Sequence, residues 1–594
     1  MDRQSTIGFI LIFIVLVVWM WLNSSKTPQQ TQRDKIVNVK KDSAMVEKAA
    51  PTPAPATDTV MQPNAYGKYF SSRARGKEQI ITIETELYRA QLSSKGGVIK
   101  TWELKNYQTW DGKPVQLVDY DHQGDLSVLL TTSDGRVINT HDLYFDVQAP
   151  ETIIKRTGTF EFEIVFSLPA SNGGMLIKRL KFHNGEYGFD EKIQFENLSS
   201  VVANYQYEVL WEHGIRYAER NSIEESNFAA GYAYAGGELT QIDATKIDQK
   251  EQKEISGAVN WVATRDKYFG IAMIPIDVVS EGAYLEGNRR AMPSNGALES
   301  YAISLKMPYK GGVSEGTAIK VFLGPLQHSI LKSYNVGLEN IMSLGWAWLV
   351  RPISEYIMLP IFLAIHSVVS NWGLVIIIFS ILIKLALHPL SKKQMESMKK
   401  MQKLQPMMDE IREKYKDDPQ RMNQAVMNLY KEYGVNPAGG CLPLLFQLPI
   451  MYALYAVFRG AIELRHSSFI WWIKDLSSPD VIYTLPFGIP IMGSEISGIA
   501  LLMGVSMFIQ SKQTVQDPRQ KSMIWMMPIM MTLVFNSLPS GLNLYYAVFN
   551  VIGIVQQIFI NKKHEDEPLR KVEPKKKNRG GIFKLAKDMP RLKK

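Results

Sequence analysis

Two hydrophobic patterns divide the chain into unlike halves. Between about residues 62 and 332, apolar and polar side chains alternate within short segments; in GTFEFEIVF, for example, Phe162, Ile164 and Phe166 share one face. This period of two predicts strands with one face exposed to water. From residue 346 to 560, long apolar runs alternate with short charged segments. The chain is therefore expected to join a soluble β-domain to a polytopic α-helical membrane domain.

Turn signals separate several short strands in the first half. In KFHNGEYGF, Asn184-Gly185 lies between two apolar segments, which predicts a hairpin. QIITIETELYRAQLSSKGGVIKTWEL is interpreted as two strands around Gly96-Gly97, and WVATRDKYFGIAMIP as another pair in the core. Because no helices alternate with these strands, the pattern favours an antiparallel β-sandwich.

The membrane half is predicted to contain one interfacial helix and five spans. Trp346–Val369 combines tryptophans with Arg351 and Glu355, which is typical of an amphipathic helix lying on the membrane. Each later apolar run is near the roughly 20 residues needed to cross a bilayer. These runs are 371–389, 438–459, 485–510, 522–538 and 541–560.

An apolar run at Ile7–Leu22 adds a sixth span. A secretory signal peptide is the alternative interpretation. The run ends near Trp19 and Trp21 and has no small-residue cleavage pattern. Since tryptophan suits a membrane interface, we favour an uncleaved anchor. Six spans place both termini on the same side.

The distribution of Lys and Arg predicts which side of the membrane holds the two termini. Most Lys and Arg residues of the membrane half lie in the 391–433 loop and the C-terminal tail, while the 463–484 loop carries few. The positive-inside rule therefore puts both termini in the cytoplasm and residues 24–345 outside. Taken alone, the charges beside the N-terminal run would predict the opposite orientation of that span, because only Arg3 precedes the run.

These patterns predict eight regions. They are an N-terminal anchor (1–23), a flexible linker (24–66), a β-sandwich domain (67–335), a junction with the interfacial helix (336–370), the second span (371–390), a helical hairpin (391–435), the third to sixth spans (436–560) and a basic tail (561–594). The net charge is +9. Basic tails bind nucleic acid, ribosomes or anionic lipid, or simply set topology.

The predicted helical hairpin carries two apolar stripes separated by the breaker KDDPQR. The stripes include Met395, Met398, Met408 and Ile411 before the breaker and Met422 after it. The simpler interpretation is that the two stripes pack on each other. The functional alternative is a soft, methionine-rich surface that captures varied apolar segments.

A lysine inside an apolar run raises a functional question. Lys384 stands in IIIFSILIKLALHPLSKKQ, close enough to Pro389 for its side chain to extend to the interface by itself. Other spans also contain polar residues, which cost several kcal/mol when they face lipid unpaired. We therefore expect a shared hydrated groove. Its candidate residues are Lys384, Ser380, Gln447, Tyr545, Tyr546 and Asn550.

No catalytic chemistry is predicted. The chain has no HExxH or GxSxG motif and no evident nucleophile–base pair, and we predict no cofactor or metal. With a single cysteine, Cys441, no disulfide forms within the chain. A secondary transporter with an extracellular accessory domain and an envelope assembly scaffold remain alternative functions, although the internal repeats typical of transporters are not evident.

Three segments resemble the core of the YidC/Oxa/Alb membrane protein insertases. They are NWGLVIIIFSILIKLALHPLSKKQMESMKKMQKLQP, YGVNPAGGCLPLLFQLPIMYALY and LPSGLNLYYAVFNVIGIVQQ. The outer domain and the junction FLGPLQHSILKSYN…GWAWLVRPI resemble the bacterial branch that has a periplasmic domain. The resemblance implies five core helices around a hydrophilic groove that is open to the cytoplasm and to lipid.

The resemblance also implies an activity and partners. The activity is insertion of nascent membrane proteins into the bacterial inner membrane without nucleotide hydrolysis. The family's groove usually holds an arginine where Lys384 stands, and lysine lacks the planar fork of arginine. The implied partners are nascent membrane proteins, ribosomes at the hairpin and tail, the Sec translocon, signal recognition components and anionic lipids.

Overall fold

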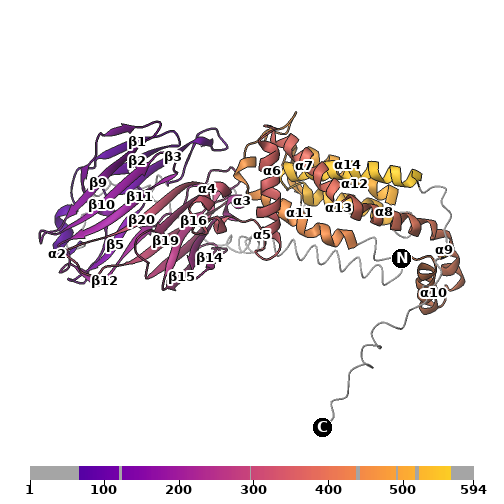
Figure 1. The fold of residues 1–594 in the computed structure, drawn as a ribbon, viewed down its shortest axis with the longest axis horizontal. Coiled ribbons are helices and arrows are strands. Elements are labelled where there is room, and N and C mark those ends of the chain that lie inside the picture. Colours follow the sequence, from indigo (N-terminus) through magenta and orange to yellow (C-terminus); the bar gives the residue numbers. More distant parts are fainter. Residues whose placement is uncertain are drawn as a thin grey trace, which may run out of the picture. The chain divides into compact units, whose positions relative to one another are not determined.

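The computed structural model describes residues 66–118, 123–293, 296–435, 442–489, 492–514, 521–563 and 571. The predicted N-terminal anchor, nearly all of the linker and most of the basic tail lie outside these ranges. The chain divides into two compact units, Met1–Ser343 and Leu344–Lys594. Figure 1 shows the first as a β-rich unit and the second as a helical one.

Three sheets build the β-rich unit. The five-stranded sheet has the order β4 (Pro114–Gln116), β3 (Val98–Gln108), β2 (Tyr88–Ser93), β1 (Ile80–Glu84) and β8 (Ile153–Lys155). The nine-stranded sheet has the order β14 (Glu238–Ile242), β13 (Ala230–Ala235), β16 (Val259–Arg265), β17 (Phe269–Pro275), β20 (Ser314–Pro325), β11 (Gly188–Glu196), β10 (Met175–His183), β9 (Glu161–Pro169) and β7 (Asp146–Gln148). The six-stranded sheet has the order β15 (Lys250–Ser256), β18 (Gly282–Met292), β19 (Gly296–Pro308), β12 (Val202–Trp211), β5 (Ser127–Thr132) and β6 (Val137–Asn139).

The pairing is antiparallel throughout these sheets except between β1 and β8. β13 and β16 pack on β18 and β19, so the two larger sheets form a sandwich. The short helical segments of this unit are α2 (Gly67–Phe70), η1 (Ser71–Arg73), η3 (Thr140–Asp142), α3 (Ser222–Ser226), α4 (His328–Ser333) and η5 (Leu338–Ile341). The predicted antiparallel β-rich domain is confirmed.

The predicted strand alternation and turns are present. In β9, Ile164 and Phe166 are buried while Glu161 and Glu163 are exposed. The β10–β11 hairpin turns at Asn184-Gly185, where Gly185 has φ 74°. β16 and β17 form the pair expected in 261–275.

Two predictions about this unit were wrong in detail. The segment that starts at Gln79 holds three strands, because Thr85 makes a turn that contains neither Gly nor Pro: its Oγ1 accepts hydrogen bonds from the backbone N–H of Leu87 (3.2 Å) and Tyr88 (3.1 Å). The unit also extends past the predicted end at residue 335. Buried Arg265 donates from Nη1 to the Ile341 carbonyl over 2.7 Å, which holds this segment on the β-domain.

The second unit is mostly helical. Its first stretch consists of α5 (Val350–Ile353), the π-helical segment η6 (Ser354–Met358) and α6 (Leu359–His366). The later elements are α7 (Trp372–Ala386), α8 (His388–Lys403), α9 (Gln405–Lys414), α10 (Pro419–Glu432), α11 (Leu442–Gly460), η8 (Ile462–Leu464), β21 (Val481–Ile489), β22 (Gly493–Ser497), α12 (Gly498–Thr514), α13 (Lys521–Phe535) and α14 (Ser540–Lys563).

The predicted interfacial helix buries both polar and apolar side chains. Its inner face carries polar groups: Arg351 Nε donates to Glu355 Oε2 over 3.2 Å, and Ser354 Oγ donates to the Ala453 carbonyl over 3.4 Å. Ile357 and other apolar side chains are exposed on the opposite face. Apolar Met358 and Phe362 are buried in the same segment, so the amphipathic character and the position on a membrane both stay predictions.

Prolines account for two departures from the predicted helices. The chain bends by 60° between α7 and α8, where Pro389 stands in the first turn of α8. The first hairpin helix is likewise broken at Leu404, just before Pro406. Proline lacks an N–H donor and clashes with the preceding turn, so it suits a helix start and tends to bend or end a helix that precedes it.

The predicted span at 485–510 was also wrong at its start. Residues 481–497 form the β21–β22 hairpin, and α12 begins only at Gly498. Pro486 and Gly488 disfavour a helix there, while Tyr483, Leu485 and Phe487 alternate as in a strand.

Helix length and composition support part of the predicted membrane topology. In the described part of the chain, Ser540–Lys562 is long and apolar enough to cross a membrane by itself. Trp372–Ala386 and His388–Lys403 pass the same test only as a bent pair, and Ile524–Phe535 is a shorter apolar helix. Six spans therefore stay a prediction.

Candidate functional site

Lys384 lies where three helices of the second unit meet. It stands near the end of α7 and is only 3% exposed. Its ammonium lies over the ring of Phe549 from α14, 3.8 Å from the ring centre. A Cβ built on Gly553, one turn further along α14, would lie 3.2 Å from Lys384 Nζ and 3.3 Å from Gln510 Nε2 of α12. The lysine therefore points into the helix bundle and not toward a separate exit along the bilayer edge.

The ammonium group has few polar neighbours. Among the described residues, no ion pair or hydrogen bond involves Lys384 Nζ. The Phe549 ring supplies a cation–π contact, which is worth about 2 kcal/mol or more when the pair is desolvated. A buried cation that contacts only an aromatic ring among the described residues favours binding of an anionic group.

Ser380 lies one turn before Lys384 on α7 and is fully buried. Its Oγ donates to the Ile376 carbonyl over 2.7 Å. This bond to its own helix satisfies the hydroxyl donor, which is common for serine inside a helix. Ser380 therefore brings a small polar group to the same bundle interior.

Two adjacent tyrosines of α14 line the same interior. The Tyr545 ring lies 5.7 Å from Phe549 and 6.3 Å from Phe379. The Tyr546 ring stands perpendicular to Phe535 of α13 at 5.1 Å. The buried Tyr546 hydroxyl has no hydrogen-bond partner among the described residues. An unpaired buried hydroxyl costs about 1–3 kcal/mol, so it marks a place for water or for a polar group of a bound chain.

Asn550 links α14 to α12. Its Nδ2 donates to Ser506 Oγ over 3.2 Å, and Ser506 Oγ donates to the Met503 carbonyl over 2.6 Å. Ser506 and Gln510 belong to this site but were missed from the sequence. Their spacing of four residues in an apolar helix was the available signal, because such residues share one face.

Gln447 is placed differently. It is half-buried on α11, and no hydrogen bond between described residues joins it to Lys384, Ser380 or the α14 residues. The structure thus places Lys384, Ser380 and Tyr545 where α7 and α14 face each other, while Tyr546 of α14 contacts α13 and Asn550 contacts α12. Since Lys384, Ser380 and Tyr545 are buried, an open hydrated groove around them stays a prediction.

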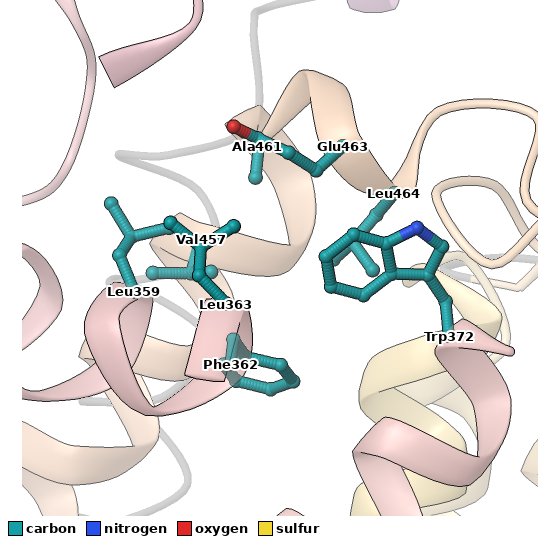
Figure 2. Close-up of a pocket in the computed structure, with 8 residues that line it drawn as sticks. All are labelled: Leu359, Phe362, Leu363, Trp372, Val457, Ala461, Glu463 and Leu464. Atoms are coloured by element: carbon teal, nitrogen blue, oxygen red, sulfur yellow. The ribbon is translucent and has the colours of Figure 1, made fainter. Parts of the chain in front are cut away.

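A small hollow lies elsewhere in this unit. Figure 2 shows it among side chains of α6, the start of α7, the end of α11 and η8. Its volume of about 10 Å³ leaves room for roughly one water. It is lined by Leu359, Phe362, Leu363, Trp372, Val457, Ala461, Glu463 and Leu464, so Lys384 is not part of it. Burial raises the pKa of Glu463.

The cytoplasmic hairpin predicted at 391–435 packs on itself. Its core consists of Leu404, Met408, Leu429, Tyr433 and Val435, with Met401, Ile411, Val426 and Tyr430 packed against it. Tyr430 OH donates to Met408 Sδ over 3.0 Å. Met408 and Ile411 are therefore core residues of the hairpin, as the simpler interpretation predicts.

The other methionines of the hairpin differ in how far they reach its surface. Met395 is buried, while Met398 and Met422 are half-buried. The exposed ones are Met407 (37% exposed) and Met427 (46%), which lie off the apolar stripes and were therefore not predicted. Met427 also lines a shallow hollow on α10.

Comparisons with known proteins cover both units. The family model described as "60Kd inner membrane protein" matches residues 364–567, and the "YidC periplasmic domain" model matches residues 80–356. A protein named membrane protein insertase YidC from Chlorobaculum parvum is 40% identical over 578 residues, which are 96% of this chain and 96% of the relative. The chain belongs to the YidC family. Another YidC, from Chlorobium phaeovibrioides, is 38% identical over 98% of this chain and 100% of its own length.

A solved structure of an active YidC insertase, with its first transmembrane domain resolved, aligns with 83% of this chain and 94% of its own. The identity is 21% and the TM-score is 0.35, so membership in the YidC family rests on the sequence matches. The two YidC models together span the β-rich unit and the helices that carry Lys384.

Proposed function

We propose that this protein inserts nascent membrane proteins into the bacterial inner membrane. The observation that carries the proposal is the match, over nearly the whole chain, to relatives named membrane protein insertases. The proposed topology is multi-pass, with both termini in the cytoplasm and residues 24–345 in the periplasm. The charge asymmetry of the loops supports it.

Lys384 is proposed to attract the polar flank of an incoming segment. Charges attract more strongly in the low-dielectric interior of a protein than in water. A carboxylate of the flank is a stronger partner for the ammonium than the Phe549 ring, because it also accepts charge-assisted hydrogen bonds. The unpaired Tyr546 hydroxyl and the Asn550–Ser506 pair offer further polar partners along the same path.

Access to Lys384 requires α7 and α14 to move apart, because the lysine is covered in this structure. Once the apolar part of the client leaves for lipid, burial of its surface yields about 25 cal/mol per Å². This partitioning supplies the free energy of release, so the step needs no nucleotide and no catalytic chemistry.

The hairpin and tail are proposed to receive clients and ribosomes. Met407 and Met427 are flexible apolar side chains exposed on a polar surface, which suits brief contact with varied segments. Lys571 of the tail forms an ion pair with Glu432 of α10, so part of the tail lies beside the hairpin. The Sec translocon, signal recognition components and anionic lipids are proposed as further partners.

Reconstitution tests this function. Purified protein in liposomes without nucleotide is expected to integrate a single-span client, seen as a protease-protected fragment, well above the level of empty liposomes. Equal protection in empty liposomes would contradict the proposal. Uptake of a small solute without client insertion would favour a transporter.

A further inference from the structure

The β21–β22 hairpin is a two-stranded element between α11 and α12 that lies apart from the residues around Lys384. The two strands pair only with each other, in a two-stranded sheet. Such a sheet is marginally stable by itself in water. Other contacts must therefore hold the hairpin in place.

Two buried polar residues supply those contacts. Asn536, directly after α13, donates from Nδ2 to the carbonyls of Met492 (3.1 Å) in the turn and Glu495 (2.6 Å) in β22, and it accepts from the backbone N–H of Ser497 (2.8 Å). Asp480, just before β21, accepts from the backbone N–H of Ile499 over 2.8 Å. The turn and β22 are thus fixed to the end of α13, and the start of β21 is fixed to the start of α12.

The strand β21 is apolar and uncovered. Tyr483 and Phe487 are 59% and 61% exposed, and Val481 and Ile482 are 41% and 48% exposed. Thr484 pairs with Glu495, the single charged residue of the 481–497 sequence. Exposed apolar surface of this kind marks a contact with a membrane or another apolar partner.

The surface around the hairpin identifies the partner. Exposed apolar side chains continue directly into the first turns of α12, at Leu501, Leu502 and Val505. In the multi-pass topology proposed above, these positions face lipid. Nearby, Trp471 and Trp472 are stacked with ring centres 5.7 Å apart, and Trp472 Nε1 donates to Asp480. Tryptophan pairs of this kind suit the boundary between headgroups and acyl chains.

We propose that the exposed apolar side chains of β21, with Tyr483 and Phe487 foremost, insert into the leaflet at the end of the bundle where α12 begins, with phospholipid as their partner. The depth is limited, because both outer edges of a two-stranded hairpin carry unpaired backbone groups that cannot lie in the hydrocarbon core. The hairpin therefore rests at the interface with its side chains directed toward the acyl chains. The lipid partner and the leaflet both rest on the proposed multi-pass topology.

Fluorescence in vesicles tests the proposal on the full-length chain. With Cys441 changed to Ser, an NBD label is placed at Phe487→Cys or, as the matched control at the polar pair with Glu495, at Thr484→Cys. The protein is reconstituted into phosphatidylcholine–phosphatidylglycerol vesicles that contain doxyl lipid, with iodide on both sides in parallel samples. Doxyl lipid is expected to quench the label at 487 several-fold more than the label at 484, and iodide is expected to show the reverse order.

Three results would overturn the proposal. Equal iodide quenching at both positions would place the β21 side chains in water. Shielding at 487 that appears only at high protein-to-lipid ratio would assign these side chains to a contact with a second copy of the chain. Shielding from iodide without doxyl quenching would mean that protein covers them. Since all of these are read without a client, they leave the insertase function unaffected.

Discussion

The ammonium of Lys384 on α7 lies 3.8 Å from the centre of the Phe549 ring on α14. This contact joins two helices at a cation that is buried away from water, which is unfavourable for a charged group. A cation–π contact offsets only part of that cost. The pair therefore favours binding of an anionic group, and the proposed insertion mechanism depends on that binding.

The Tyr546 hydroxyl offers a separate test, because it is buried without a partner among the described residues. Tyr546→Phe removes an unsatisfied group, so it is expected to stabilise the protein by about 1 kcal/mol, or to raise its melting temperature in detergent by about 2–4 °C. If a client uses the hydroxyl, insertion falls in the same variant. Tyr483→Phe, which alters an exposed tyrosine outside the site, is the control and should change neither quantity. A Tyr546→Phe protein with lower stability would show that the hydroxyl is satisfied in the folded state.

The two exposed methionines of the hairpin can be separated from its core. Met407→Glu and Met427→Glu should leave the helical content intact, because both side chains reach solvent, while weakening photocrosslinking of the hairpin to nascent chains. Met408→Glu places a charge in the hairpin core and should unfold it, at a cost of several kcal/mol. Asn428→Glu adds the same charge beside Met427 without removing a methionine. Equal loss of crosslinking with Asn428→Glu would attribute the effect to charge alone.

The β-rich unit has a pH-dependent element at Glu299. Burial raises the pKa of this carboxyl to about 7, even though Tyr301 OH donates to Oε2 over 2.6 Å and Arg289 Nη1 to Oε1 over 2.5 Å. Since the pKa in the folded state is above that of the unfolded chain, the native state binds more protons between about pH 4.5 and 7. The free energy needed to open β18 and β19 is therefore expected to fall as pH rises through this window, by at most about 3 kcal/mol.

Hydrogen exchange of β18 and β19 peptides, corrected for intrinsic rates, measures this effect in the full-length protein. Glu299→Gln keeps the shape of the side chain but cannot ionise, so its opening free energy should vary less steeply between pH 4.5 and 7 than that of the wild type. An unchanged slope in Glu299→Gln would assign the pH dependence to other groups.

Local patterns predicted much of the fold because they depend on nearby residues. The Asn184-Gly185 turn and the alternation in β9 follow from turn chemistry and from a period of two, and both are present. The Thr85 turn was missed because a side-chain hydroxyl replaces the usual Gly or Pro. The β21–β22 hairpin was missed because its apolar residues merge with those of α12 into one run of span length.

The site was only partly predictable. An inward-facing Lys384 follows from the number of polar residues in neighbouring spans. Its contact with Phe549 and its closeness to Gly553 depend on how α7 and α14 are aligned, which tertiary packing sets and local sequence does not encode. Met407 and Met427 were not predicted, because apolar stripes at helical spacing indicate buried residues and these two methionines are exposed.

The charge of Lys384 is tested most directly by insertion of two matched single-span clients, one with an acidic flank and one with a neutral flank, into liposomes that contain wild type, Lys384→Arg or Lys384→Gln. Losing one charge-assisted contact of about 1.5 kcal/mol corresponds to about tenfold. The account predicts that Lys384→Gln lowers insertion of the acidic client by about this factor and affects the neutral client much less, while Lys384→Arg inserts both. Equal insertion of the acidic client by wild type and Lys384→Gln would contradict it.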